Sequence, residues 1–226
     1  MNVLIVIPTQ FEAERILPRY KSILVQGELI DLKSGSDNIF ALITGPGPFL
    51  TTYHLGRLLL QKKFDLVVQL GIAGSHDHNI QIPQLVNITS DQFIDFGSED
   101  GKNRIDAQEL GFYQHDELLN ESTLSPEIKP TSNMFIKDIY PMKGVTVYTA
   151  TGSVATGERI VSKYGMVSES MEGAAFFYCC LKENTPCLQI RAISNVAGPR
   201  NKDEWKTLEA LDLLKSYMEL NFKTHL

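Results

Sequence analysis

The chain has 226 residues, of which 43% are hydrophobic and 21% are charged, ordinary usage for a globular protein that excludes disordered and fibrous classes. Its formal net charge of -6 argues against surfaces that neutralise phosphate backbones or anionic lipid, so we expect neither nucleic acid nor a membrane as a partner. No apolar run is long enough for a membrane span, and the first residues do not resemble a secretion signal. We therefore expect a cytoplasmic protein that folds as a single domain over residues 1–226.

Short apolar runs alternate with longer stretches of helical periodicity, a pattern typical of an α/β protein with a largely parallel sheet. The expected strands are residues 3–7, 40–43, 66–70, 85–88, 145–148 and 188–193. The expected helices are residues 49–63, 173–184 and 204–222. Pro48 suits the first position of the first of these helices. Apolar residues from Trp205 to Met218 lie near helical spacing, and we expect them to face the core.

Residues 93–142 interrupt the alternation of strands and helices. They are polar, and glycine and proline break every periodic pattern in them. A stretch of this length without a core of its own is usually a functional loop or a disordered insert. We expect an irregular excursion over one edge of the sheet.

The histidines and cysteines give no sign of a metal site. Cys179, Cys180 and Cys187 have no histidine at zinc-site spacing, and we expect them to be small buried side chains in a reducing compartment. His76 and His78 stand in a polar stretch and would need metal ligands from distant parts of the chain. The sequence therefore predicts no metal.

Several glycines invite a nucleotide-cofactor interpretation, because a glycine-rich turn lets the backbone approach a pyrophosphate. The segment GPG at 45–47 lacks the third glycine of a dinucleotide-binding turn, and no GxxxxGK[ST] phosphate loop occurs. Tight turns that bring a sugar or base close to the backbone explain the same glycines. We predict no cofactor.

The most informative positions follow the apolar runs, because ligands of open α/β sheets bind beyond the carboxyl ends of the strands. Glu12 stands just after the first run, where a helix should begin. Gly71 and Ile72 follow the third run, and Asn195 follows the last run, which contains Arg191. We expect these side chains to lie around one site.

The segment ESMEGAA at 169–175 is the most specific piece of the chain. It places the carboxylate of Glu172 beside the soft apolar side chain of Met171, followed by small residues that open a helix. Such a pair suits a sugar, with the carboxylate accepting from the hydroxyls and the methionine packing on the ring. Taken alone, Glu172 is more simply explained as an acid stabilised by the helix dipole.

Together with GIAG at 71–74 and RAISN at 191–195, this segment resembles the purine nucleoside phosphorylase and nucleosidase superfamily. The resemblance covers residues 1 to about 220, is strong in those three motifs and is vague across 93–142. It implies an α/β three-layer sandwich around a central mixed, partly barrel-like sheet. It also implies a homodimer, as in the nucleosidase branch, that binds a small-molecule purine nucleoside.

The resemblance assigns roles to the candidate site residues. Glu172 would bind the ribose hydroxyls and Met171 would pack against the ribose. Asn195 would contact the purine, while Glu12 and Arg191 would act on the attacking water. These roles suit cleavage of an N-riboside, in which positive charge builds on the sugar and electrons collect on the purine. Glu12 could also be a solvated acid at a helix start.

The nucleophile is predicted from the third apolar run and the glycines after it. Phosphorylase members of the superfamily place an arginine just before the glycine turn and a hydroxyl residue within it, whereas this chain has Gln69 and Ile72 there. Without charge-assisted donors to hold phosphate, water is the favoured nucleophile. Gly71 and Ile72 are expected to form part of the substrate-binding wall.

The base is predicted from Asn195, because nucleosidases of the superfamily that act on 6-aminopurines have an aspartate there. A carboxamide offers one donor group and one acceptor, matching O6 and N7–H of a departing 6-oxopurine, but it has no proton to give. The sequence therefore predicts hydrolysis of a 6-oxopurine nucleoside. Two alternatives stay open, a nucleosidase for methylthioadenosine and adenosylhomocysteine, and a nucleoside-binding protein that has lost the chemistry.

Overall fold

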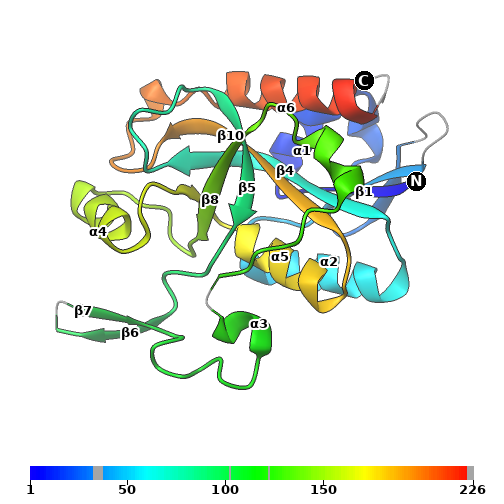
Figure 1. Ribbon diagram of the computed structural model, residues 1–226. Coiled ribbons are helices and arrows are strands. Elements are labelled where there is room, and N and C mark those ends of the chain that lie inside the picture. The colour runs from blue at the N-terminus through cyan, green and yellow to red at the C-terminus, as the bar shows by residue number, and fades with distance from the viewer. Residues whose placement is uncertain (33–37, 102, 122, 223–226) are drawn as a thin grey trace.

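The first strand, β1 (Asn2–Ile7), shows why the strands are continuous apolar runs. Val3 and Ile5 pack into the core on one face of the sheet, while Leu4 and Val6 pack into a second core on the other face. A strand covered on both faces has no reason to alternate apolar and polar residues. Figure 1 shows the whole molecule as a computed structural model, which describes residues 1–32, 38–101, 103–121 and 123–222.

Eight strands form the central sheet. The others are β2 (Leu29–Asp31), β3 (Asn38–Ile43), β4 (Leu66–Ser75), β5 (Gln84–Ser90), β8 (Tyr140–Thr146), β9 (Ser168–Ser170) and β10 (Cys187–Val196). Their order is β10-β5-β8-β9-β4-β1-β3-β2, and β10 also pairs with β4. The strands β4, β10, β5, β8 and β9 therefore close into a ring, from which β1, β3 and β2 extend as an open sheet. The predicted mixed, partly barrel-like sheet is confirmed.

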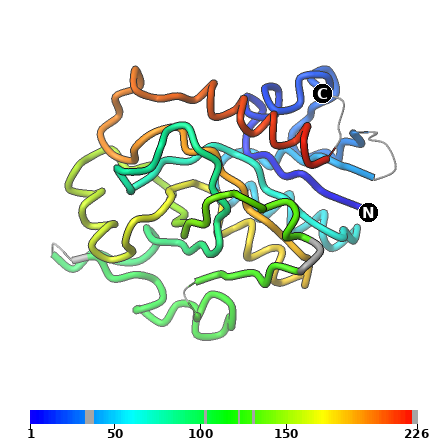
Figure 2. Tube along the Cα trace, turned by 45° about the horizontal axis from the view of Figure 1, so that its top comes forward, coloured from blue at the N-terminus to red at the C-terminus, as the bar shows by residue number. Residues whose placement is uncertain are grey.

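Helices cover both faces of the sheet (Figure 1). On one face lie α1 (Gln10–Ile16) and α6 (Thr207–Phe222), and on the other lie α2 (Pro48–Gln61) and α5 (Gly173–Lys182). Figure 2 shows α6 running beside the N-terminal segment, where Arg15 donates two hydrogen bonds of 2.8 and 2.7 Å to the carboxylate of Asp212. The predicted three-layer α/β sandwich is confirmed.

The helix α4 (Val154–Tyr164) was not predicted. Ser153 caps its start, accepting a hydrogen bond from the backbone N–H of Thr156. Ile160 of this helix packs on Val145 at the end of the ring. Val154, Thr156 and Gly157 have weak helix propensity, which hides the helix in the sequence.

The apolar stripe of α6 faces the core only in part. Leu211, Leu214 and Met218 are fully buried, but Leu208 is 52% exposed. Trp205 precedes the helix and is half-buried. The prediction that the whole stripe faces the core was wrong at these two positions. Trp205 lies outside the helix, which begins at 207 rather than 204, and Leu208 lies exposed in its first turn.

The excursion over residues 93–142 has more structure than predicted. It contains a hairpin of β6 (Gly97–Asp100) and β7 (Asn103–Asp106), which projects from the body in Figure 1, and the short helix α3 (Glu117–Asn120). Short 3-10 turns also occur at Pro18–Ile23, Pro130–Phe135 and Lys202–Glu204. Ile94, Ala107, Leu124 and Phe135 are buried, so the excursion is anchored by apolar contacts.

The three cysteines are buried free thiols, as predicted. Within the described residues, no helix has the length and apolar character needed to cross a membrane. Over the same part of the chain, no three side chains of the metal-binding types lie together in a way that could hold an ion.

Candidate active site

A cavity of about 260 Å³ opens at the carboxyl ends of the central strands. Five of the residues singled out from the sequence line it, namely Glu12, Ile72, Met171, Glu172 and Asn195. The other two, Gly71 and Arg191, are buried and lie within contact distance of Glu12 and Glu172 respectively. The structure therefore brings all seven candidate residues together, from α1, β4, β10 and the start of α5.

One wall of the cavity is formed by β4, at a place where one edge of this strand is not paired with another strand. Pairing with β1 ends at Gln69, and pairing with β9 begins at Gly74. Residues 70–73 therefore have no strand on that edge, although β10 pairs with the opposite edge throughout. The expectation of a turn after residue 70 was wrong, because the glycine-rich segment continues as strand. The backbone N–H of Ile72 instead donates to Glu12 Oε1 at 2.9 Å.

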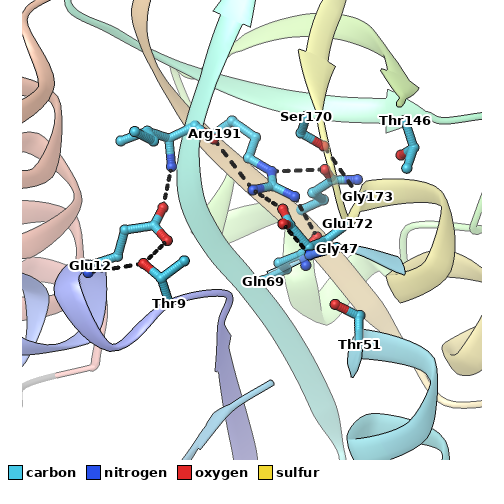
Figure 3. Close-up of polar contacts among 12 residues, drawn as sticks. Thr9, Glu12, Gly47, Thr51, Gln69, Thr146, Ser170, Glu172, Gly173 and Arg191 are labelled. Atoms are coloured by element: carbon cyan, nitrogen blue, oxygen red, sulfur yellow. Dashed lines mark hydrogen bonds and ion pairs between the residues drawn. The ribbon is translucent and has the colours of Figure 1, made fainter. Parts of the chain in front are cut away.

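Glu12 is held from two sides at the third position of α1. Thr9 caps this helix, and its Oγ1 accepts from the backbone N–H of Glu12 at 3.2 Å and donates to Glu12 Oε2 at 2.5 Å (Figure 3). Glu12 is only 5% exposed, so the prediction of a strand-to-helix carboxylate is confirmed but the solvated alternative is wrong. Burial raises the pKa of Glu12, against the opposing hydrogen bonds from Thr9 and Ile72. Such a carboxylate is a better proton acceptor than an exposed one.

Arg191 is fully buried, and its guanidinium is held by groups of the protein itself. Its Nε donates to Gln189 Oε1 and its Nη2 donates to Gln69 Oε1, both at 3.0 Å. Its Nη1 lies 3.4 Å from the carbonyl oxygen of Ile72 and 3.5 Å from Glu172 Oε2 (Figure 3). The two glutamines were not assigned these roles from the sequence, although amides inside apolar strands are a sign of a buried polar partner.

Gly71 separates Arg191 from Glu12. A Cβ at this position would lie 2.6 Å from Arg191 Nη1 and 3.2 Å from Glu12 Oε1. The absence of a side chain therefore lets the two charged groups approach the same stretch of β4.

Glu172 stands at the N-cap of α5 but makes no side-chain bond to that helix. Its Oε1 accepts from the backbone N–H of Gly47 at 3.0 Å, and it is 5% exposed. Gly45 and Gly47 have φ of 88° and 86°, so the GPG segment is the tight turn that the sequence predicts. The position at a helix start is confirmed, while the partners of Glu172 lie across the cavity in Gly47 and Arg191.

Asn195 follows a β-bulge in β10 that shifts the strand by one residue. Its Oδ1 accepts from Ser194 Oγ at 2.8 Å, and its Nδ2 donates to the carbonyl oxygen of Val196 at 2.8 Å. An amide has two lone pairs and two N–H groups. One acceptor site and one donor therefore stay available to a ligand in the cavity.

Residues 2–223 match the Phosphorylase superfamily. The chain belongs to this family. It is 27% identical to a futalosine hydrolase of Streptomyces coelicolor over 154 residues, which are 68% of this chain and 63% of that protein, less than two thirds of the relative. It is 26% identical to a 5′-methylthioadenosine/S-adenosylhomocysteine nucleosidase of Colwellia psychrerythraea over 215 residues, 87% of this chain and 81% of that protein.

A solved structure shares the fold. It is a mutant of the Helicobacter pylori MTAN with 5′-methylthioadenosine in its active site, with a TM-score of 0.76 and 18% identity over 97% of this chain and 96% of that chain.

A buried histidine supports one wall of the cavity in this member of the Phosphorylase superfamily, and the sequence did not reveal it. His76 is 1% exposed, and its Nε2 lies 3.0 Å from Glu169 Oε2. The backbone N–H and Oγ1 of Thr151 also donate to this carboxylate, at 2.8 and 2.5 Å. Although burial opposes it, these hydrogen bonds hold the pKa of Glu169 below its ordinary value. The carboxylate comes from a strand 93 residues further along the chain, which no local pattern could show.

A further buried acid, Asp91, supports the amides around Arg191. It accepts from Thr146 Oγ1 at 2.8 Å and from Gln189 Nε2 at 3.4 Å. Burial raises the pKa of Asp91 to about 7. The hydrogen-bond chain from Asp91 through Gln189 to Arg191 fixes the orientation of the guanidinium.

Proposed function

We propose that this protein hydrolyses the N-ribosidic bond of a 6-oxopurine nucleoside, with futalosine as its substrate. The products would be hypoxanthine and dehypoxanthine futalosine, which places the reaction in menaquinone biosynthesis. The observation that carries the proposal is one cavity faced by Glu12, Glu172 and Asn195 beside an arginine whose donors are already engaged. Names of curated relatives, futalosine hydrolase among them, support it.

In the proposed reaction, water attacks C1′ of the ribose from the side of Glu12. Glu12 takes one proton from the water as the new C–O bond forms and the C–N bond breaks. Arg191 was expected to act on the water, but its Nε and Nη2 donate to Gln189 and Gln69. We assign it instead to Glu172, whose Oε2 lies 3.5 Å from Nη1, so that it keeps this carboxylate facing the sugar. Glu172 accepts from the ribose hydroxyls and stabilises the cation-like sugar, while Met171 packs against the ring.

The departing base receives the electron pair of the broken C–N bond. As the base departs, its N7 takes a proton from solvent water, and Glu12 later returns the proton of the attacking water to solvent. Asn195 Oδ1 accepts from the resulting N7–H, and Nδ2 donates to O6. The bonds from Ser194 and to Val196 O set the amide in one orientation before the base arrives. Preorganised partners of this kind stabilise developing charge without rearranging.

Water is the proposed nucleophile because the described residues of the inner wall, where C1′ would lie, include no cation with donors free to hold phosphate. Where phosphorylase members have an arginine, this chain has Gln69, whose amide is itself bound to Arg191. Ile72 presents an apolar side chain to the cavity. A phosphate dianion would need charge-assisted donors at that place.

The expected result with futalosine is base release at the same rate with and without added phosphate. In water labelled with heavy oxygen, the label should appear at C1′ of the sugar product, measured by mass spectrometry. A sugar 1-phosphate among the products would contradict hydrolysis, and release of adenine from methylthioadenosine in preference to hypoxanthine would favour the second candidate.

The second candidate is a 5′-methylthioadenosine/S-adenosylhomocysteine nucleosidase, the name of the Colwellia relative that aligns over 87% of this chain. Asn195 separates the two proposals. With a 6-aminopurine, the amino group faces the donor of the carboxamide. Turning the amide places its NH2 opposite N7, where the departing adenine has to gain a proton, and removes the bonds of the amide to Ser194 and Val196.

Replacing Asn195 with aspartate is expected to shift the substrate preference toward the aminopurine. One mispaired polar group in a closed site costs about 1–3 kcal/mol, or roughly one to two decades in kcat/KM. The Asn195→Asp variant should lose activity on futalosine and gain it on methylthioadenosine at mildly acidic pH, where the carboxylic acid is populated. The measurement is the ratio of the two kcat/KM values. An unchanged ratio would show that position 195 does not distinguish the bases.

We also propose a cytoplasmic homodimer, as the family resemblance implies. Phe49 and Tyr53 on α2 are 76% and 60% exposed, and Phe49 packs against Tyr148 with ring centroids 5.4 Å apart. Exposed aromatic side chains gathered in this way support burial against a second copy.

A further inference from the structure

The outer part of the active-site cavity has a different character from its inner wall. The inner wall carries the carboxylates and the amide described above. Toward the outside, the lining residues are Phe11, Pro46, Trp205 and Arg200. Phe11 is 58% exposed and Trp205 is half-buried. This outer part is therefore largely aromatic, with one cation.

Arg200 is the basic residue among the described residues that line the cavity, whose acidic members are Glu12, Glu169 and Glu172. It is exposed, and its guanidinium carbon lies 5.1 Å from the centroid of the Trp205 ring. This ring contact is its sole interaction with the described residues.

The neighbouring acid on the same loop does not neutralise Arg200. Glu204 Oε1 accepts from Asn201 Nδ2 at 2.7 Å. A guanidinium that lies over an aromatic ring keeps the edges of its plane, and hence its N–H donors, available to a carboxylate. Arg200 therefore has both the charge and the free donors to bind an anionic group at the cavity mouth.

The placement of the nucleoside determines which part of it reaches Arg200. This step rests on the proposed function, in which Glu172 holds the ribose hydroxyls, Glu12 faces C1′ and Asn195 faces the base. These contacts occupy the inner wall. The 5′ substituent is the remaining part of the nucleoside and has to leave the cavity past the outer residues.

We propose that Arg200 and Trp205 form a subsite for a 5′ substituent that carries an apolar or aromatic body and a carboxylate. Trp205 and Phe11 contact the body, and Arg200 binds the carboxylate through two N–H donors. A neutral 5′ substituent leaves Arg200 without an ionic partner. The subsite thereby selects acidic nucleosides over neutral ones that have the same base and sugar.

The test compares futalosine, whose 5′ substituent ends in a carboxylate, with its uncharged carboxamide and with inosine. The Arg200→Gln variant should lose roughly ten- to a hundredfold in kcat/KM for futalosine, mainly through KM. Its kcat/KM for inosine and for the carboxamide should stay within about twofold of wild type. Wild type should prefer futalosine over the carboxamide, and the variant should not.

The matched control is Arg57→Gln, because Arg57 also lies over an aromatic ring, with its guanidinium carbon 5.6 Å from the Tyr53 centroid. Arg57 does not line the cavity, and the Arg57→Gln substitution should leave kcat/KM unchanged for futalosine, its carboxamide and inosine. An equal loss for all substrates with Arg200→Gln, or no loss for any, would overturn the subsite.

A binding measurement separates this inference from the proposed reaction. Calorimetric titration of futalosine into Glu12→Gln, with and without Arg200→Gln, needs no turnover. Weaker binding in the double variant by the same ten- to hundredfold factor supports the subsite, and equal binding overturns it. Absence of base release from futalosine and inosine by wild type would overturn the proposed reaction instead, whatever the titration shows.

Discussion

Replacing Glu12 with glutamine is expected to lower kcat by roughly two to four decades, the usual contribution of a general base. Glutamine keeps the shape of the side chain and can still accept from the backbone N–H of Ile72, which now donates to Glu12 Oε1 at 2.9 Å. It cannot take a proton from water. Steady-state kinetics on futalosine should therefore show a large loss in kcat with little change in substrate binding.

The pH dependence gives an independent measure of the same group. Burial raises the pKa of Glu12, so the acid side of the wild-type kcat/KM profile should fall at a pH above that of an ordinary glutamate. The fall should be absent from the residual activity of Glu12→Gln.

The raised pKa of Glu12 also predicts the stability of the variant. A carboxyl whose folded-state pKa lies above its unfolded value contributes stability below the unfolded pKa and loses that contribution as the pH rises through the folded one. At neutral pH, Glu12→Gln should therefore unfold at a temperature no lower than that of wild type. Glu14→Gln is the control on the same helix, where Glu14 pairs with Lys21 at 2.9 Å on the surface.

If Glu12→Gln kept a third of the wild-type turnover, Glu12 would have to be regarded as structural.

Replacing Glu172 with glutamine is expected to lower kcat by roughly two to three decades, comparable to the loss of one preorganised charge-stabilising group. The interaction of the carboxylate with the sugar strengthens as the ribose becomes cationic, so its loss affects the transition state more than the bound substrate. Glutamine can still accept from the Gly47 N–H, so the turn before α2 should keep its place. The measurement is kcat and KM on futalosine.

The kinetic pattern decides between catalysis and plain binding at Glu172. A rise in KM with kcat unchanged would mean that the carboxylate holds substrate and transition state equally. Glu158→Gln removes one negative charge from the exposed face of α4, and should change neither constant. This comparison separates a local effect at the sugar from a change in overall charge.

Much of the fold could be predicted because the strands are buried on both faces. Consecutive residues of β1, such as Ile5 and Val6, belong to different cores, so the strand is one continuous apolar run. The glycine-rich part of β4 was misread because Gly71 and Gly74 favour turns locally. Pairing with β10 along the whole opposite edge overrides that preference.

The site could be predicted only as far as its motifs reach. Glu172 and Asn195 lie in segments that resemble the family and were found from them, while Glu12 was found from its place just after the first apolar run. The residues that support the site were not found, because Gln69 bonds to Arg191 from the neighbouring strand β4 and His76 bonds to Glu169 of the neighbouring strand β9. Such partners depend on the order of strands in the sheet, and the local spacing of residues along the sequence does not determine that order.

The gap between β1 and β9 bears on how the chemistry of this scaffold could change. The donor that holds Glu12 there is the peptide N–H of Ile72, which every residue except proline supplies. The side chain at 72 faces the cavity but takes no part in that bond. A hydroxyl-bearing residue could therefore replace Ile72 without loss of the backbone bond to Glu12. The cavity wall could then accommodate another nucleophile while Glu12 kept its position. At position 72 the backbone N–H has to be kept because it holds Glu12, whereas the side chain is free to diverge.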